Sequence, residues 1–196
     1  PQVVLDAARY AIDSELVGYT DALGLDDLRQ ALSAYYHTTY KVDVSPERFV
    51  ITTGSSAGFI ITFLACLDAG QKVAVTAPGY PAYTNIIQSL DLKPVTIALG
   101  QENNWTLTTD DLRDAEKTHG AIDALLIASP ANPTGTMLSK QALTELSLDC
   151  THAGRWFFSD EIYHGLTYAQ EAKSALQVGD HNRLIVMNSF SKYFSM

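Results

Sequence analysis

Cysteine is scarce in this sequence of 196 residues. The two that occur, Cys66 and Cys150, are far apart, and neither belongs to a Cys-x-x-Cys pair or a cysteine–histidine cluster. A disulfide framework and a structural zinc site both need such groupings, so the sequence predicts neither, and no metal site is expected. Two reduced thiols are typical of a cytosolic protein, and we expect a cytoplasmic location.

Positive charge is also in short supply. The chain has 13 Lys and Arg against 22 Asp and Glu, which gives a formal net charge of −9. Nucleic acids and anionic membranes are bound electrostatically by basic surfaces, so we expect neither as a partner. The most apolar stretch, residues 59–67, is far shorter than the roughly 18 residues of a membrane span. No basic region followed by an apolar run marks a signal peptide.

Low-complexity tracts and internal repeats are absent as well. Apolar residues make up 46% of the chain and charged residues 18%, which is enough apolar mass to bury a core. At about 150 residues per domain, the length predicts one domain, or one domain with an incomplete attachment.

Short runs of β-branched or aromatic residues alternate with longer segments of helical periodicity, which is typical of βαβ units. Several runs are apolar at both odd and even positions, as expected of strands covered on both faces. We therefore predict an α/β fold of three layers, α/β/α, around a mostly parallel sheet. The predicted strands are residues 49–53, 72–76, 95–99, 124–128, 156–159 and 183–188. The predicted helices are residues 25–36, 57–69, 109–117 and 139–153, with residues 1–20 forming one helix and then a loop.

Polar residues follow five of the predicted strands, at the edge where open α/β sheets bind ligands. Taken singly, each has an ordinary structural explanation, such as a turn, a helix cap, a core aromatic or a solvated lysine. Their convergence on one edge is what indicates a site. The candidates, in chain order, are Ser55, Ser56, Tyr80, Asn132, Asp160, Tyr163, Ser189 and Lys192.

Two functions compete for the segment around Ser55 and Ser56. A glycine and two serines between a strand and a helix offer free backbone amides to a phosphate group. The same segment also matches the G-x-S-x-G nucleophile elbow of α/β-hydrolases, with Ser56 as nucleophile. Asp160, followed by His164 or His181, would then complete a triad. No Gly-rich oxyanion-hole segment precedes it, and this alternative leaves Tyr80, Asn132 and Lys192 without a role.

A pyridoxal-phosphate site uses the whole set. Asp160 follows an apolar run, where a buried carboxylate needs a cationic or hydrogen-bonding partner such as a ring nitrogen. Lys192 lies among Phe190, Tyr193 and Phe194, which would desolvate its amine and favour nucleophilic use. In such a site a lysine holds the cofactor as a Schiff base, and a carboxylate keeps the pyridine nitrogen protonated.

The chain resembles the class I/II aminotransferases of the fold-type I pyridoxal-phosphate enzymes. Its most specific motifs are Asn-Pro-Thr-Gly at residues 132–135, Ser-Asp-Glu-Ile-Tyr at 159–163 and Ser-Phe-Ser-Lys at 189–192, and the resemblance extends from Tyr19 to Lys192. It implies pyridoxal 5'-phosphate as cofactor and an incomplete large domain, which in this family holds a seven-stranded, mostly parallel sheet. It also implies amino-group transfer between an amino acid and a 2-oxo acid.

The resemblance assigns a role to each candidate. Lys192 would hold the cofactor and shuttle the substrate α-proton, and Asp160 would pair with the pyridine nitrogen. Asn132 and Tyr163 would hold the ring hydroxyl oxygen, and Tyr80 would stack on the ring. Ser55, Ser56 and Ser189 would bind the phosphate. Tyr19 would reach the phosphate in a partner subunit, which implies a homodimer.

The family's phosphate-binding and carboxylate-binding arginines have no counterpart after Lys192, and neither does its small domain. We therefore expect residues 1–24 to be a helix and loop that lead into an incomplete cofactor-binding domain of residues 25–196. We also expect this segment alone to be inactive. Three alternatives remain open: a C–S lyase or related enzyme with the same cofactor, an aminotransferase-like sensor domain of a transcription regulator, and the hydrolase.

Overall fold

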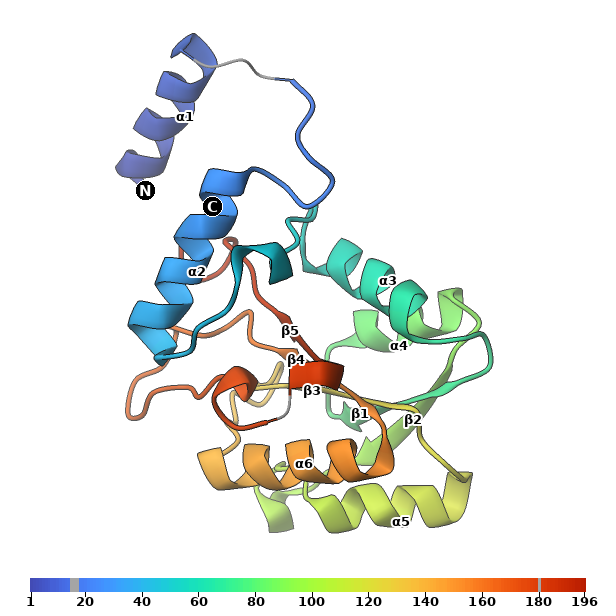
Figure 1. Ribbon diagram of the computed structural model, residues 1–196. Helices are drawn as coiled ribbons and strands as arrows, with labels where there is room; N and C mark the ends of the chain where they lie inside the picture. The colour runs from blue at the N-terminus through green and yellow to red at the C-terminus, as the bar shows by residue number, and fades with distance from the viewer. Residues whose placement is uncertain (15–17, 180) are drawn as a thin grey trace. The chain divides into compact units, whose positions relative to one another are not determined.

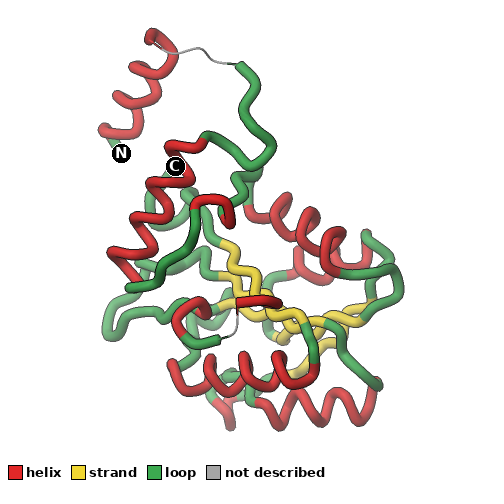
Figure 2. The backbone as a smooth tube through the Cα atoms, in the orientation of Figure 1, coloured by secondary structure: helices red, strands yellow, loops and turns green. Residues whose placement is uncertain are grey.

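The computed structural model describes residues 1–14, 18–179 and 181–196 (Figures 1 and 2). Its internal contacts divide these residues into two compact units. The larger unit is Thr53–Ser189, and the smaller unit combines Pro1–Thr52 with Phe190–Met196.

A five-stranded, all-parallel sheet forms the centre of the larger unit, so the predicted parallel sheet is confirmed. The strands follow the order β2-β1-β3-β4-β5 across the sheet. Their bounds are Lys72–Ala77 for β1, Lys93–Ala98 for β2, Ala124–Ala128 for β3, Trp156–Asp160 for β4 and Leu184–Met187 for β5.

Helices cover both faces of this sheet, which confirms the predicted three layers. Figure 1 shows α3 (Ser55–Cys66) and α4 (Pro81–Ser89) on one face, with α5 (Thr109–His119) and α6 (Lys140–Ala153) on the other. Short 3-10 turns, η2 (Gln101–Asn103), η3 (Ala175–Gln177) and η4 (His181–Arg183), lie in the connections.

Side chains of the central strand β3 point alternately to the two faces of the sheet, so both faces carry an apolar cluster. Leu125 and Ile127 of β3 belong to the apolar cluster under α5 and α6. Ala124 and Leu126 point the other way, into the cluster with the α3 and α4 side chains. A strand apolar at every position is therefore buried on both sides, as its sequence predicts.

Helix ends follow local capping chemistry. The Ser139 hydroxyl accepts from the Ala142 amide at the start of α6, and Gly154 ends the helix with φ +65°. The Thr108 side chain caps α5 by accepting from the Asp111 amide. The predicted end of α3 at residue 69 is wrong, because this helix ends at Cys66.

The predicted strand over residues 49–53 is wrong. These residues carry no strand assignment, and the Ile51 amide donates to the Leu23 carbonyl at 3.0 Å. A strand needs a ladder of such bonds along a neighbour, and a single bond does not supply one. The apolar run is therefore an irregular connection into α3.

The prediction also omitted α4. Pro81 occupies its first turn, where a missing amide hydrogen has no cost and the fixed φ favours the helix. Tyr83 and Ile87, one turn apart, are its buried residues. This helix of 9 residues is too short to show a long periodic pattern.

The smaller unit contains α1 (Gln2–Ser14), α2 (Asp26–Tyr40) and the 3-10 turn η1 (Pro46–Arg48). Helix α1 buries none of its residues. The prediction for residues 1–20 includes residues 15–17, which lie outside the described part of the chain. In α2, the buried Arg29 donates to the Gly24 and Pro46 carbonyls, which ties the helix to its flanking loops. No helix in the described part of the chain is long and apolar enough to cross a membrane.

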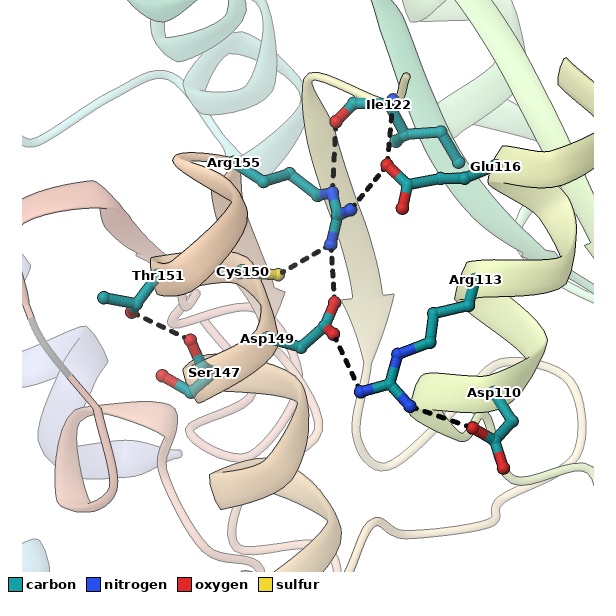
Figure 3. Close-up of polar contacts among 9 residues, drawn as sticks. All are labelled: Asp110, Arg113, Glu116, Ile122, Ser147, Asp149, Cys150, Thr151 and Arg155. Atoms are coloured by element: carbon teal, nitrogen blue, oxygen red, sulfur yellow. Dashed lines mark hydrogen bonds and ion pairs between the residues drawn. The ribbon is translucent and has the colours of Figure 1, made fainter. Parts of the chain in front are cut away.

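Arg155 joins α5 and α6 beneath the sheet (Figure 3). Its side chain is 1% exposed, and its guanidinium contacts Glu116 at 2.7 Å and Asp149 at 2.9 Å. Its Nε also donates to the Ile122 carbonyl at 3.1 Å. Both carboxylates and the carbonyl therefore satisfy a charge that would otherwise be costly to bury.

We expect Arg155→Ala to lower the free energy of unfolding by about 3 kcal/mol, because it leaves two partly buried carboxylates without their cation. Arg113 is the matched control, since it contacts the same Asp149 at 3.4 Å but is 56% exposed. Arg113→Ala should cost less than about 1 kcal/mol. Urea unfolding of the full-length protein measures both, and equal losses would contradict the assignment of Arg155 as the buried link.

Candidate active site

The carboxyl ends of all five strands lie at one edge of the sheet, because all are parallel. The chain moves from β1 to β2 on one side and then to β3 on the other, so the winding direction reverses between β1 and β3. Ligands bind beyond the strand ends at such a reversal. Tyr80 follows β1 and Asn132 follows β3, so the two candidates flank this point.

Asp160 is the last residue of β4 and is 3% exposed. Its Oδ2 accepts from the Tyr83 hydroxyl at 2.5 Å, and its Oδ1 accepts from the Ile162 amide at 3.0 Å. Burial raises the pKa of this carboxyl above its ordinary value, and the two hydrogen bonds act in the opposite direction. The carboxylate is therefore held in one orientation at the ligand-binding edge.

Tyr83 is a site residue that the sequence reasoning missed. Its ring lies edge-on to Tyr80, with centroids 5.5 Å apart, and to Phe59 at 5.3 Å. Burial, followed by the nearby Asp160 carboxylate, raises the pKa of the Tyr83 hydroxyl, so it keeps its proton and donates. The available signal was Pro81, which marks a helix start and places Tyr83 one turn after Tyr80.

Tyr80 caps the start of α4 and is 45% exposed. One edge of its ring meets Tyr83, which in turn holds Asp160. A partly exposed aromatic ring and a buried carboxylate are thus joined through a single side chain.

Asn132 and Tyr163 meet across neighbouring strands. Asn132 Nδ2 donates to the Tyr163 hydroxyl at 3.4 Å, and both side chains are half-buried. Asn132 belongs to the loop after β3, and Tyr163 to the turn after β4. Because β3 and β4 pair with Ala128 opposite Asp160, the two segments leave the sheet side by side.

The residues assigned to a phosphate lie at the start of α3 and after β5. Gly54 precedes the helix with φ +111°, a conformation that side chains rarely adopt, and Ser55 and Ser56 form the first turn. Amides in a first helical turn are unpaired and carry the positive end of the helix dipole, which suits an anion. Ser189 is half-buried, and its amide donates to Asn188 Oδ1 at 2.8 Å.

Lys192 and Tyr19 belong to the smaller unit, and both are exposed. The desolvation of the Lys192 amine by its aromatic neighbours stays a prediction. Among those neighbours, Phe194 packs against Tyr35 at 5.9 Å and Tyr193 at 5.1 Å.

Among the described side chains, the hydrolase arrangement with His164 is not formed. The His164 ring lies between the Ser129 carbonyl and Glu161, while Asp160 binds Tyr83 and Ile162. A triad needs the acid to orient the histidine, and here each is held by other groups. His181, the second histidine of that alternative, lies outside the described side chains.

Comparison with known proteins agrees with this geometry. The family model for aminotransferase class I and II matches residues 1–196. The valine–pyruvate aminotransferase of Mycobacterium tuberculosis is 38% identical over 196 residues, which are 100% of this chain and 50% of that protein.

Solved structures give the same result. A crystal structure of an aminotransferase from Mycobacterium tuberculosis has a TM-score of 0.93 at 39% identity, and the match covers 100% of this chain and 53% of that one. Aspartate aminotransferase from Thermus thermophilus with maleate has a TM-score of 0.93 at 28% identity, covering 100% and 50%.

The chain therefore belongs to the class I and II aminotransferase family. It spans about half the length of the curated relatives that it matches.

We expect Tyr83→Phe to destabilise the protein by about 1 kcal/mol at neutral pH, because Asp160 loses a buried hydrogen-bond donor. That bond stabilises the ionised carboxyl, so its loss raises the pKa of Asp160 further. The destabilisation should then increase as the pH rises through the folded-state pKa of Asp160. Unfolding of the full-length protein without cofactor, measured at several pH values, tests this.

Tyr80→Phe serves as the control, since it removes a hydroxyl from the neighbouring, partly exposed ring. It should cost less than about 0.5 kcal/mol and show no such pH dependence. A pH-independent loss in Tyr83→Phe would show that the hydroxyl does not act on Asp160.

Proposed function

We propose that the full-length protein containing this chain is a pyridoxal-phosphate-dependent aminotransferase, which moves an amino group between an amino acid and a 2-oxo acid. The main support is Asp160, a buried carboxylate at the ligand-binding edge, oriented by Tyr83 and the Ile162 amide. Family membership supports the same reaction class.

The donor set of the larger unit fits this cofactor. Asp160 would hold the protonated ring nitrogen, Asn132 and Tyr163 the ring oxygen, and Tyr80 the ring face. Ser55, Ser56 and Ser189 would bind the phosphate. When bound, pyridoxal phosphate supplies an electron sink for the bonds of the substrate Cα.

Lys192 would perform the remaining tasks. Its amine would hold the aldehyde carbon of the cofactor and, once displaced by the substrate amine, would move a proton at the substrate Cα. Tyr19, which is fully exposed here, would reach the phosphate of a second subunit, so we also propose a homodimer.

Residues 25–196 would form the cofactor-binding domain, preceded by residues 1–24, in a cytoplasmic protein. The same assignment predicts that this segment, expressed alone, has no measurable transaminase activity.

Lys192→Ala in the full-length protein tests the proposed function. We expect the visible absorbance of bound pyridoxal phosphate and its trapping by borohydride to disappear, because both need the Lys192 amine. Lys173→Ala, which removes a lysine paired with Glu171 at 3.2 Å, is the control and should leave both unchanged. Absorbance and trapping that survive Lys192→Ala would refute the site.

A substrate panel then separates the reaction types. Valine with pyruvate is the first pair to test, because a 38% identical relative is named for it. We expect each amino acid consumed to yield one equivalent of 2-oxo acid together with one new amino acid. Release of ammonia or sulfide without a new amino acid would instead identify a lyase.

A further inference from the structure

Glu161 is a buried carboxyl to which the proposed function gives no role. It follows Asp160 directly and is 1% exposed. Its Oε1 accepts from the Ala175 amide at 2.8 Å and from the Ser159 hydroxyl at 3.1 Å. Its Oε2 is also buried, and within the described residues no hydrogen bond reaches it. An orphaned buried carboxylate oxygen is costly and calls for an explanation.

His164 faces that oxygen. Its Nδ1 lies 3.5 Å from Glu161 Oε2, and its Nε2 lies 2.9 Å from the Ser129 carbonyl oxygen. A carbonyl can only accept, so Nε2 carries a hydrogen and donates it. In a neutral ring, Nδ1 is then an acceptor, and it lies 3.5 Å from Oε2, which is another acceptor when the carboxyl is ionised. Without a proton between them, Nδ1 and Oε2 would be two acceptors that repel each other.

We propose that Glu161 and His164 share one proton, carried on Glu161 Oε2 and donated to His164 Nδ1, and that this neutral pair positions Asn132 and Tyr163. The result is a continuous relay from the Glu161 carboxyl through the His164 ring to the Ser129 carbonyl. That Asn132 and Tyr163 are positioned for pyridoxal phosphate rests on the proposed function.

The surroundings favour the neutral pair over an ion pair. The adjacent Asp160 must be ionised to hold a cationic ring nitrogen, and a second buried anion beside it would be repelled. Burial raises the pKa of the Glu161 carboxyl to about 7, although the Ala175 amide and the Ser174 and Ser159 hydroxyls oppose this.

The same burial acts on the imidazole. It lowers the pKa of His164 to about 4, against the hydrogen bond to the Ser129 carbonyl. Burial therefore disfavours the charged form of both groups, so that His164 is neutral above about pH 4 and Glu161 is protonated below about pH 7.

The pair binds together the two segments that carry the ring-oxygen donors. Ser129 begins the loop that leads to Asn132, and it is held at three points. Its amide donates to the Asp160 carbonyl at 3.1 Å, its hydroxyl accepts from the Leu138 amide at 3.0 Å, and its carbonyl accepts from His164.

Tyr163 directly precedes His164 in the turn after β4. Glu161 anchors that turn to η3 through Ala175, and His164 anchors it to the loop of Asn132. The contact between Asn132 and Tyr163 therefore depends on two side chains that lie behind it. We regard Glu161 and His164 as positioning residues.

The first test uses the unaltered full-length protein. Nitrogen NMR of labelled histidine should show His164 as a neutral ring protonated at Nε2 from pH 6 to pH 8. Infrared spectra at pH 6 should contain the carbonyl band of a buried protonated carboxyl, which is absent from Glu161→Gln. A His164 imidazolium, or a missing band, would overturn the proposal. Neither measurement requires bound cofactor, so failure of the proposed function would leave both readouts intact.

Glu161→Gln and Glu161→Leu form the second test. Glutamine is uncharged and donates from the same position, whereas leucine has a similar volume but no donor or acceptor. The dissociation constant of pyridoxal phosphate should stay within about twofold in Glu161→Gln and rise about tenfold in Glu161→Leu, as for loss of buried hydrogen bonds.

A spectroscopic readout separates positioning from stability. The pH midpoint of the visible absorbance of bound pyridoxal phosphate should rise in Glu161→Leu, because an anionic ring oxygen would lose well-placed donors. Glu161→Gln should keep the midpoint of the unaltered protein. Equal behaviour of the two variants, in affinity and in midpoint, would refute the shared proton.

Discussion

The charge on Asp160, buried at the end of β4, is the constraint on which the rest of the site depends. A carboxylate in this position is stable only with donors, and Tyr83 and the Ile162 amide supply them from two different segments. Tyr83 can donate only while it stays protonated, which its own burial ensures. The next residue along the chain, Glu161, is more deeply enclosed still. The proton that we propose for it would spare the site a second negative charge. Burial thus has the largest effect on the protonation of Tyr83 and of Glu161, and the nearby Asp160 carboxylate acts in the same direction.

Parallel strand pairing brings the remaining groups to this charge. The register of β3 against β4 sets Ala128 opposite Asp160, so the Asn132 loop and the Tyr163 turn leave the sheet together. The hydrogen bond between Asn132 and Tyr163 is therefore a consequence of topology as much as of side-chain chemistry. Residues that are distant in sequence meet because each directly follows a strand of one sheet.

Much of the sheet and of the candidate site was predictable from the sequence, since strand ends and the polar residues after them can both be recognised locally. The parallel sheet, its two covered faces and the candidates Asp160, Asn132 and Tyr163 follow from that pattern. Tyr83 could not be recognised, because a buried tyrosine in a short helix looks like a core aromatic until its hydroxyl is seen to meet Asp160. The contact between Glu161 and His164 was not predicted, because Asp160 and Tyr163 already accounted for the motif at residues 159–163. The run at residues 49–53 has the composition of a strand, but only a partner strand, which composition does not reveal, would make it one.

Arg155 and its two carboxylates have a consequence for how this fold can be altered. They fasten α5 to α6 on one face of the sheet, whereas Tyr83, which donates to Asp160, comes from α4 on the opposite face. The ion pairs that hold α5 and α6 together and the hydrogen bond from α4 to Asp160 therefore lie on opposite faces of the sheet. A directed-evolution library confined to α5 and α6 could retune thermal tolerance without changing the residues that meet the ligand, and one confined to the opposite layer could explore new specificities on an undisturbed support.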